Sequence, residues 1–347
     1  MFKSQQLRLS AKLYFPAFPR MAKDMLGSLY PMSASSISRL TAEDIPASTS
    51  SRQKLESALK YAALAPTENG WQPWYFQLAD TYVELMTKKN PAREAVDPER
   101  REFMIGCGSA LLCLKLALKH FGSLGRVALF PDLSQPALVA RIHLGFSGEQ
   151  GAQEKLLFRA MAASRTNVAP LAETPLSEMM LEALGQAAAG GRSWLDFIQS
   201  EMSRQQVMKT TLPDGQRWPN LRSSTRLSFS FGGRNIRLWD GAIEPAQPPA
   251  VSTVTLAVLK TKTDDKHGWL EAGQTMARTV LQAQALGLSW GFYNPVRRRE
   301  AREALRIGIG HKGFAQVILW FGDRNAQMWN GAVEQVRQPS QPSIRWR

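Results

Sequence analysis

The sequence has few of the residues that build disulfide frameworks or metal centres. It holds two cysteines and four histidines among 347 residues. Cys107 and Cys113 lie six positions apart in an apolar run of helical pattern, and this spacing makes a disulfide within one helix sterically implausible. No cysteine and histidine spacing typical of zinc sites occurs. We therefore expect no metal, a reducing compartment and two cysteines that pack as small hydrophobic side chains.

The sequence also lacks a clear secretory signal and a long uninterrupted apolar run. Near the N-terminus, Pro16, Pro19 and Arg20 interrupt the apolar residues before a hydrophobic segment can form. The longest apolar stretch, at about 104–118, is interrupted by Lys115 and therefore falls short of a membrane span. These features predict a cytoplasmic protein with no membrane insertion.

Acidic residues are scarce relative to basic ones, with 29 Asp and Glu against 43 Lys and Arg and a formal net charge of +14. Such a charge is compatible with a nucleic acid, an anionic membrane surface or an acidic small molecule as partner. The basic residues are scattered, apart from the short cluster at 297–299. Because no zinc finger, RNP motif or basic-region heptad is present, we expect a small-molecule substrate and no specific nucleic acid.

Hydrophobic periodicity predicts the first elements of a folded module. Apolar residues recur at helical spacing from Leu55 to Ala62, and the pattern stops at Pro66. Residues 74–86 then alternate in the manner of a β-hairpin, with its turn near Asp80. The module therefore begins with an amphipathic helix followed by two antiparallel strands.

A second helix, apolar on almost all sides, is predicted between Asp97 and Gly122. Asp97 is a candidate N-cap, Pro98 would take the first helical position, and Gly122 would form the C-terminal cap. A helix that is apolar all round is expected to be central and buried. The stretches RVALF and ALVARIHLGF then predict two strands that close the module near residue 148.

The second half of the chain repeats this order of elements. It contains a predicted helix from Ser177, then the strand VSTVTLAVL, the helix and strand LEAGQTMARTVLQAQALGLSWGF, and the strand AQVILWFG. The segments IGCGSALLCLKLALKHFG and LEAGQTMARTVLQAQALG align without a gap, pairing Gly108 with Gly273 and Gly122 with Gly287. This alignment indicates an internal duplication, while a chance match between two Gly-capped helices is the alternative.

These patterns divide the chain into four parts and one insertion. The segment after Tyr30 is rich in Ser and Pro, which predicts a poorly ordered N-terminal arm. Residues 200–250 are rich in Pro, Gly, Arg and Ser without a clear period and predict an insertion or lid. The predicted parts are the arm at 1–50, a first module at 51–150, a second module with the insertion at 151–330, and a C-terminal tail at 331–347.

One stretch carries a chemical signature, LKYAALAPTENGWQPWYFQL. It resembles the nitroreductase-family motif APSxxNxQPWxF, in which a helix ends at Ala-Pro and the following loop lies against a flavin ring. The matching residues are Ala65, Pro66, Thr67, Gln72, Pro73, Trp74 and Phe76. The alternative is a purely structural role, in which a Pro-terminated helix leads into an aromatic core strand.

A flavin ring needs a backbone near its edge, polar groups for its rim and apolar walls for its faces. The resemblance implies that the loop residues supply these contacts to FMN. The residues implied at the ring are Pro66, Thr67, Glu68, Asn69, Gly70 and Gln72.

A second stretch, RAMAASRTNVAPLAETPLS, resembles the RRTNRxPF stretch of the Acg-like branch of that superfamily, where an arginine-rich turn holds the FMN phosphate. Arg165, Thr166 and Asn167 match, and an arginine fork suits phosphate. Ser164 and Val168 stand where the family has arginines. The loss of these charges would weaken FMN binding by about one to four orders of magnitude.

Other residues are candidates for contact with the FMN phosphate. His311, in the turn GIGHKGF, would approach the phosphate or ribityl chain, although a surface turn residue is the alternative. Arg337 is a candidate for the late phosphate-contacting arginine of the family. Arg234, Arg237 and Lys312 are further candidate substitutes.

The resemblance covers about residues 50–325. It implies an α+β, nitroreductase-like fold of two pseudo-symmetric modules, each with a central sheet flanked by helices, which share one FMN pocket. It further implies hydride transfer from NAD(P)H to FMN and on to a nitroaromatic or quinone-like acceptor. No catalytic side chain is assigned because the flavin carries this chemistry.

Two other functions stay open at this point. The chain would be a non-catalytic protein that sequesters FMN beneath a lid, formed by residues 200–250, or a degenerate relative that has lost flavin. The oligomeric state is also open, between a monomer and a homodimer, because a duplicated chain no longer needs a partner to complete its pocket.

Overall fold

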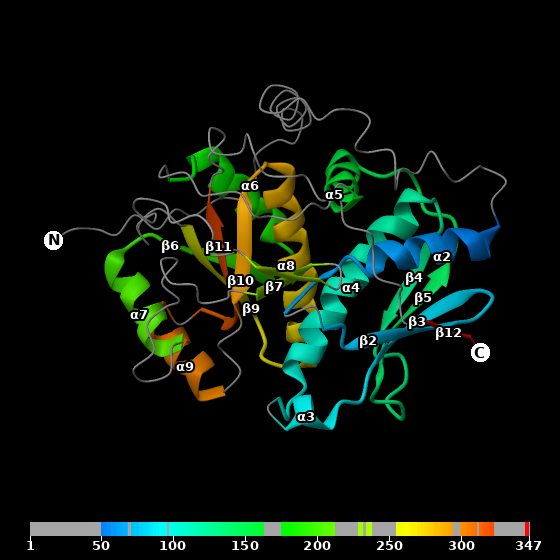
Figure 1. The fold of residues 1–347 in the computed structure, drawn as a ribbon, viewed down its shortest axis with the longest axis horizontal. Coiled ribbons are helices and arrows are strands. Elements are labelled where there is room, and N and C mark those ends of the chain that lie inside the picture. The colour runs from blue at the N-terminus through cyan, green and yellow to red at the C-terminus, as the bar shows by residue number, and fades with distance from the viewer. Residues whose placement is uncertain are drawn as a thin grey trace.

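A computed structural model describes residues 50–68, 71–95, 97–162, 175–211, 228–231, 234–237, 255–293, 299–310, 312–322 and 344–346. In these residues two largely antiparallel sheets lie on either side of a pair of long helices, α4 (Arg101–His120) and α8 (Lys266–Ala285), as Figure 1 shows. The combination of helices with separate antiparallel sheets confirms the α+β fold class.

The first module surrounds α4. Its first helix, α2 (Ser51–Ala62), begins with a capping box, in which Ser50 Oγ accepts a hydrogen bond from the Gln53 backbone N–H and the Gln53 side chain accepts one from the Ser50 backbone N–H. The other elements are β2 (Trp74–Leu78), β3 (Tyr82–Thr87), α3 (Pro91–Glu94), β4 (Leu124–Leu129) and β5 (Leu138–Leu144).

The second module surrounds α8. Its elements are α5 (Ala152–Ala162), α6 (Glu178–Ala188), β6 (Ser193–Ile198), α7 (Glu201–Thr211), β9 (Thr255–Thr261), β10 (Ser289–Tyr293), α9 (Arg299–Gly308) and β11 (Phe314–Gly322). A separate small sheet consists of β1 (Pro66–Glu68), β7 (Ser228–Phe231) and β8 (Arg234–Arg237). The last strand, β12 (Ile344–Trp346), adds to the first sheet parallel to β2.

The two modules have the same sheet topology. The strand order is β2-β3-β5-β4 in the first sheet, beside β12, and β6-β9-β11-β10 in the second. In each module two strands precede the long helix and two follow it. Each long helix leads into its edge strand through a glycine with positive φ, 66° at Gly122 and 75° at Gly287. The predicted pseudo-symmetry of two modules is therefore confirmed.

The long helices touch each other at their paired glycines. A Cβ atom on Gly108 would lie 2.1 Å from the carbonyl oxygen of Leu270, and one on Gly273 would lie 1.9 Å from that of Ile105. The contact is reciprocal, because each glycine faces the residue one turn before the other glycine. Such a self-complementary contact is what two copies related by a twofold axis would make, and only glycine allows the backbones to approach so closely.

The cores of the modules are continuous across this helix pair. One hydrophobic cluster includes side chains of α2, α4 and α8 and of both larger sheets. A second cluster packs α7 and α9 against the far face of the second sheet, through Val207, Leu305 and Ile318. Because helices cover both faces of that sheet, β9 and β11 are buried almost without alternation, whereas β2 alternates between buried and half-buried residues.

The predicted start of α4 is wrong. The helix begins at Arg101, and its N-cap is Arg100, whose φ of 57° is left-handed, rather than Asp97 with Pro98 in the first turn. The Asp97 carboxylate nevertheless accepts hydrogen bonds from the backbone N–H groups of Arg101 at 3.0 Å and Glu102 at 2.9 Å. Although it lies in the turn before the helix, Asp97 therefore provides hydrogen-bond acceptors for two backbone N–H groups that have no partner within the helix.

The apolar character of α4 reflects its burial. The helix is long and apolar enough to cross a membrane by length and composition alone, which contradicts the expectation that its sequence is too interrupted. However, 83% of its most apolar window is buried inside the protein. Cys107 and Cys113 lie in this buried helix as free thiols, as predicted, and burial raises the pKa of Cys113 to about 12. Both therefore pack as small hydrophobic side chains.

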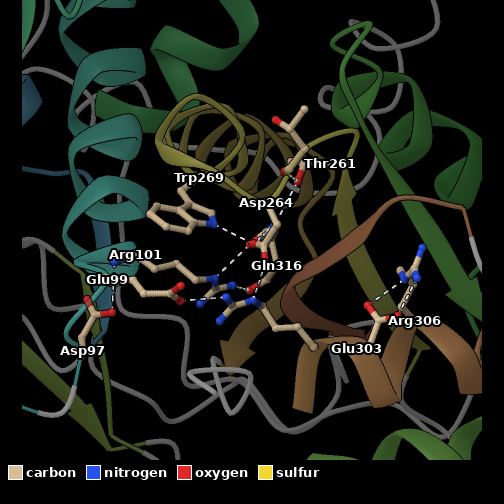
Figure 2. A network of polar contacts seen from close by, with 11 residues as sticks. Asp97, Glu99, Arg101, Thr261, Asp264, Trp269, Glu303, Arg306 and Gln316 are labelled. Atoms are coloured by element: carbon tan, nitrogen blue, oxygen red, sulfur yellow. Dashed lines mark hydrogen bonds and ion pairs between the residues drawn. The ribbon is translucent and has the colours of Figure 1, made fainter. Parts of the chain in front are cut away.

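A buried polar network ties the two modules together near the start of α4 (Figure 2). Arg101 is fully buried and donates hydrogen bonds to the Gln316 side chain at 2.9 Å and to the Gln316 carbonyl oxygen. The Gln316 amide in turn donates to Thr261 at 2.9 Å and Asp264 at 3.1 Å. Burial lowers the pKa of Arg101 to about 10, so the side chain stays charged at neutral pH.

Asp264 is the acidic centre of this network. It accepts hydrogen bonds from Trp269 Nε1 at 2.7 Å and from Arg302 Nε at 2.9 Å, and Arg302 also pairs with Glu99 at 2.9 Å. Burial alone would raise the pKa of the Asp264 carboxyl, but the hydrogen bonds from Trp269 and Gln316 and the charge of Arg302 outweigh burial and hold the pKa below its usual range.

The helix contact predicts a severe effect of a small substitution. Gly273→Ala would place a methyl group against the backbone of Ile105, and we expect the free energy of unfolding to fall by about 2 kcal/mol or more, measured by urea denaturation. Gly185→Ala is the matched control within a helix, because its nearest neighbour, Phe197, lies at an ordinary contact distance of 3.8 Å. Equal stability of the two variants would contradict the close contact.

The network predicts a pH dependence of stability. Because the folded pKa of Asp264 lies below the unfolded value of about 3.9, its contribution is complete above that value and is lost as the pH falls through the folded pKa. Asp264→Asn should lower the free energy of unfolding at neutral pH by roughly 3 kcal/mol. It should also reduce the loss of stability in acid, as measured by urea denaturation at a series of pH values. Parallel pH profiles for the variant and the unchanged protein would refute this role.

Candidate functional site

A pocket lies where the loop after α2 meets both long helices. Its lining residues come from β1 and the following loop, α3, α4, α8, β10 and β11, and therefore from both modules. The lining consists of Pro66, Thr67, Trp71, Pro73, Arg93, Glu102, Ile105, Gly106, Met276, Phe292 and Val317. Apolar side chains dominate it, and a few polar groups lie among them, as is typical of a small-molecule site.

Gly106 allows the loop to lie against α4. A Cβ atom at this position would lie 2.5 Å from Cγ of Pro73, inside the distance that real Cβ atoms show. The ring of Pro73 cannot move aside like the end of a flexible side chain. The missing side chain at Gly106 is therefore a geometric requirement for the position of this loop.

Hydrogen bonds from three elements hold the loop. Ser109 Oγ donates to the carbonyl oxygen of Pro66 at 3.0 Å, and Gln72 Nε2 donates to that of Ala63 at 3.1 Å. The backbone N–H of Lys88 donates to the carbonyl oxygen of Pro73 at 2.8 Å. Thr67 is 4% exposed and lines the pocket. The loop is thereby fixed to α2, α4 and the end of β3.

Aromatic and charged side chains form one wall of the pocket. Trp71 contacts Phe103 edge-to-face with ring centroids 4.8 Å apart, and the guanidinium of Arg93 lies 5.1 Å from the centroid of a Trp71 ring. The polar network adjoins this wall, since Arg101 and Gln316 are the chain neighbours of the lining residues Glu102 and Val317. The pocket therefore combines a flat aromatic surface with one cation and one carboxylate.

The equivalent region of the second module is filled by larger side chains. In the alignment of the two long helices, Gly106, Ser109, Ala110 and Cys113 correspond to Glu271, Gln274, Thr275 and Arg278. Both sets follow a single helix face.

The larger side chains on α8 hydrogen-bond to residues on either side of the loop after α6, in α6 and β6. Ser193 Oγ lies 3.3 Å from Glu271 Oε1 and 2.7 Å from Thr275 Oγ1, and Arg278 donates to the carbonyl oxygen of Ala187. A Cβ atom on Gly190 would lie 2.5 Å from Glu271 Oε1. The Glu271 carboxylate thus lies against the loop after α6, from the helix position that corresponds to Gly106.

The structure brings together only part of the predicted site. Pro66 and Thr67 line the pocket, Gln72 holds the loop, and the backbone of Glu68 belongs to β1. Arg234 and Arg237 lie on β8, and Lys312 is exposed before β11. Asn69, Gly70, Arg165, Thr166, Asn167, His311 and Arg337 lie outside the described residues.

Several lining residues were missed by sequence reasoning. They are Arg93, Glu102, Ile105, Gly106, Met276, Phe292 and Val317. Gly106 was the one detectable signal, because a glycine inside an apolar helix often marks a close approach of another segment. Met276, Phe292 and Val317 join the pocket only when the second module packs on the first.

A strand from the predicted insertion lies against the same loop. β7 pairs antiparallel with β1, with Thr67 opposite Ser230 and Glu68 opposite Phe229. The backbone of this segment therefore runs beside the residues that follow Pro66. Within the described residues, no group of three or more His, Cys, Asp or Glu side chains has the arrangement of a metal site.

Comparisons with known proteins show which proteins the whole chain resembles. No family model matches the chain. The chain is 26% identical over 298 residues to the "Putative NAD(P)H nitroreductase Rv3131" of Mycobacterium tuberculosis, covering 78% of this chain and 85% of that protein. It is 25% identical over 301 residues to the "Putative NAD(P)H nitroreductase acg" of the same organism, covering 77% and 88%.

A solved structure, nitroreductase A from Vibrio parahaemolyticus, is 12% identical and has a TM-score of 0.32, covering 53% of this chain and 72% of that one. A TM-score of this size does not support a fold assignment, so the assignment depends on the curated relatives and on the topology described above. The match to the two mycobacterial proteins spans most of both chains. The chain is thus similar over most of its length to two putative NAD(P)H nitroreductases, one of them acg, which confirms the resemblance found in its sequence.

Proposed function

We propose that this chain binds FMN in the pocket between its modules and uses it to transfer electrons from NAD(P)H to small nitroaromatic or quinone-like acceptors. We call the segment with Gln72, Pro73 and Trp74 the QPW loop. Its position against Gly106, at the junction of both modules, is the main observation behind this proposal. The names of the two mycobacterial relatives, which describe them as putative NAD(P)H nitroreductases, support the same reaction class.

The lining residues fit a flat, mostly apolar ring with a polar rim. Ile105, Met276 and Val317 offer apolar contacts, and Gly106 lets Pro73 and its loop lie close to α4 beside them. Pro66 and Thr67 line the pocket, and they supply backbone groups and a hydroxyl of the kind that the rim of a flavin needs. The donor set of the site thus suits FMN.

The chain's own residues would bind, orient and shield the ring. When bound, FMN supplies the hydride transfer itself. The backbone beside Pro66 and the Thr67 hydroxyl would fix the rim, while Phe292 and Met276 would keep water from one face. Arg165, Thr166 and Asn167 are proposed to hold the phosphate, on the strength of the motif. No side chain has to act as a general acid or base.

A second candidate function, storage of FMN without turnover, is favoured by one contact. β7, within the predicted 200–250 insertion, pairs with β1 of the flavin loop. Such a strand would cover the loop edge and restrict the approach of NAD(P)H or an acceptor. Redox turnover is preferred because the two mycobacterial relatives are named as NAD(P)H nitroreductases, while the storage function is tested by the same experiment.

The proposal predicts a yellow protein whose colour responds to a nicotinamide. The purified chain, supplemented with FMN and freed of excess by gel filtration, should keep a flavin absorption band. That band should bleach when NADPH or NADH is added under anaerobic conditions and return when a nitroaromatic or quinone is added. A flavin band that does not bleach would support storage instead. A colourless protein that FMN does not reconstitute would reject both functions.

The geometry at Gly106 predicts a selective loss of FMN binding. Gly106→Ala would push Pro73 and the QPW loop away from α4, and we expect the Kd for FMN to rise by about tenfold or more, because a displacement cost above about 1.4 kcal/mol has that effect. Titration of the apoprotein, followed by quenching of flavin fluorescence, measures the change. Gly185→Ala, with open surroundings in α6, is the control and should bind FMN as the unchanged protein does. Unaltered binding by Gly106→Ala would place the flavin elsewhere.

A further inference from the structure

Arg93 is a cation built into the wall of the pocket. It lies in the short helix α3, where Asn90 Oδ1 accepts a hydrogen bond from the Arg93 backbone N–H at 3.2 Å. Its guanidinium lies 5.1 Å from the centroid of a Trp71 ring, and Trp71 is itself held edge-to-face by Phe103. Both Arg93 and Trp71 line the pocket. The side chain is therefore oriented before any ligand arrives.

The charge of Arg93 is not neutralised by its acidic neighbour. The carboxylate of Glu94 pairs with Arg100 at 3.8 Å and accepts a hydrogen bond from the backbone N–H of Asn90 at 3.5 Å. Among the described residues, no carboxylate lies within 4.0 Å of the Arg93 guanidinium. In that part of the chain, Arg93 keeps its hydrogen-bonding fork for a ligand.

From this arrangement we propose that Arg93 selects acceptors in which an anionic group, such as a carboxylate or sulfonate, is attached to an aromatic ring. The proposal depends on the flavin reaction proposed above and names its substrate class. An arginine fork binds a carboxylate through two parallel hydrogen bonds, and the face of Trp71 would stack on the ring that carries it. The two side chains together match both parts of such a molecule.

Glu102 is the opposing charge of the pocket lining. It stands in the first turn of α4, and its carboxylate would repel an anion that enters the site. The preference for anions therefore depends on how the ligand lies in the pocket. Its charged group has to point toward α3, and its ring has to point toward Gly106. Glu102→Gln should strengthen the binding of an anionic ligand, which is the opposite of the effect of removing Arg93.

The test compares 4-nitrobenzoate with neutral 4-nitrobenzamide, which has nearly the same shape. Binding to the FMN-loaded protein is followed by quenching of tryptophan fluorescence without nicotinamide, and kcat/KM is measured separately. The unchanged protein should prefer the anion by about tenfold or more. Arg93→Gln should abolish this preference by weakening nitrobenzoate alone, and Arg93→Lys should retain part of it, because an ammonium lacks the planar fork.

Arg126→Gln is the matched control, since Arg126 is an exposed arginine on β4 whose loss changes the net charge equally. It should leave the preference unchanged. Equal affinity of the unchanged protein for both ligands, or a preference that survives Arg93→Gln, would overturn the proposal. If Arg93→Gln does not fold, as judged by circular dichroism, Arg93→Lys and the ratio in the unchanged protein decide the matter.

Two other outcomes also reject the selection of anionic acceptors by Arg93. A rise in the KM of Arg93→Gln for NADPH but not for NADH, with the preference for 4-nitrobenzoate intact, would show that Arg93 binds the extra phosphate of NADPH instead. A rise in the Kd for FMN alone would assign Arg93 to the flavin. Failure of the flavin reaction is distinguishable, because it appears as a protein without a reducible flavin band, whereas failure of this inference appears in a protein that has one.

Discussion

The close contact between α4 and α8 is the constraint on which the rest of the fold depends. Gly108 and Gly273 bring the two backbones together, and the reciprocal positions of Leu270 and Ile105 give the contact the character of a twofold interface within one chain. Each long helix leads through a left-handed glycine into an edge strand of its own sheet. The helix pair therefore positions both modules and the pocket where they meet.

The two sides of this helix pair have diverged. On α4 a face of small residues, including Gly106 and Ser109, accepts the loop after α2 and leaves room for a ligand. On α8 the corresponding face carries Glu271 and Arg278, whose side chains interact with residues around the loop after α6. In this duplicated chain, one helix face therefore adjoins the pocket, and the equivalent face makes internal polar contacts. The buried network around Asp264 fixes the two modules near the pocket.

Local patterns predicted most elements, because hydrophobic periodicity and glycine caps act within one segment. The hairpin around Asp80, the buried helix and the repeated glycines were found in this way. The strand β6 and the helix α9 were missed, although α9 has a clear amphipathic pattern, and so was the left-handed start of α4 at Arg100. In the site, the motif indicated Pro66 and Thr67, while Phe292 and Val317 reach the pocket only through packing between modules. Their convergence depends on tertiary contacts that no local sequence pattern encodes.

The central claim is that one flavin lies on the α4 side of the helix pair and none on the α8 side. An X-ray structure of the protein crystallised with FMN tests this claim most directly. The account predicts one flavin per chain, with its ring between the backbone at Pro66–Thr67 and the surface of α4 at Gly106. A ring bound beside Glu271, a second flavin in the same chain, or a pocket that stays empty at saturating FMN would contradict it.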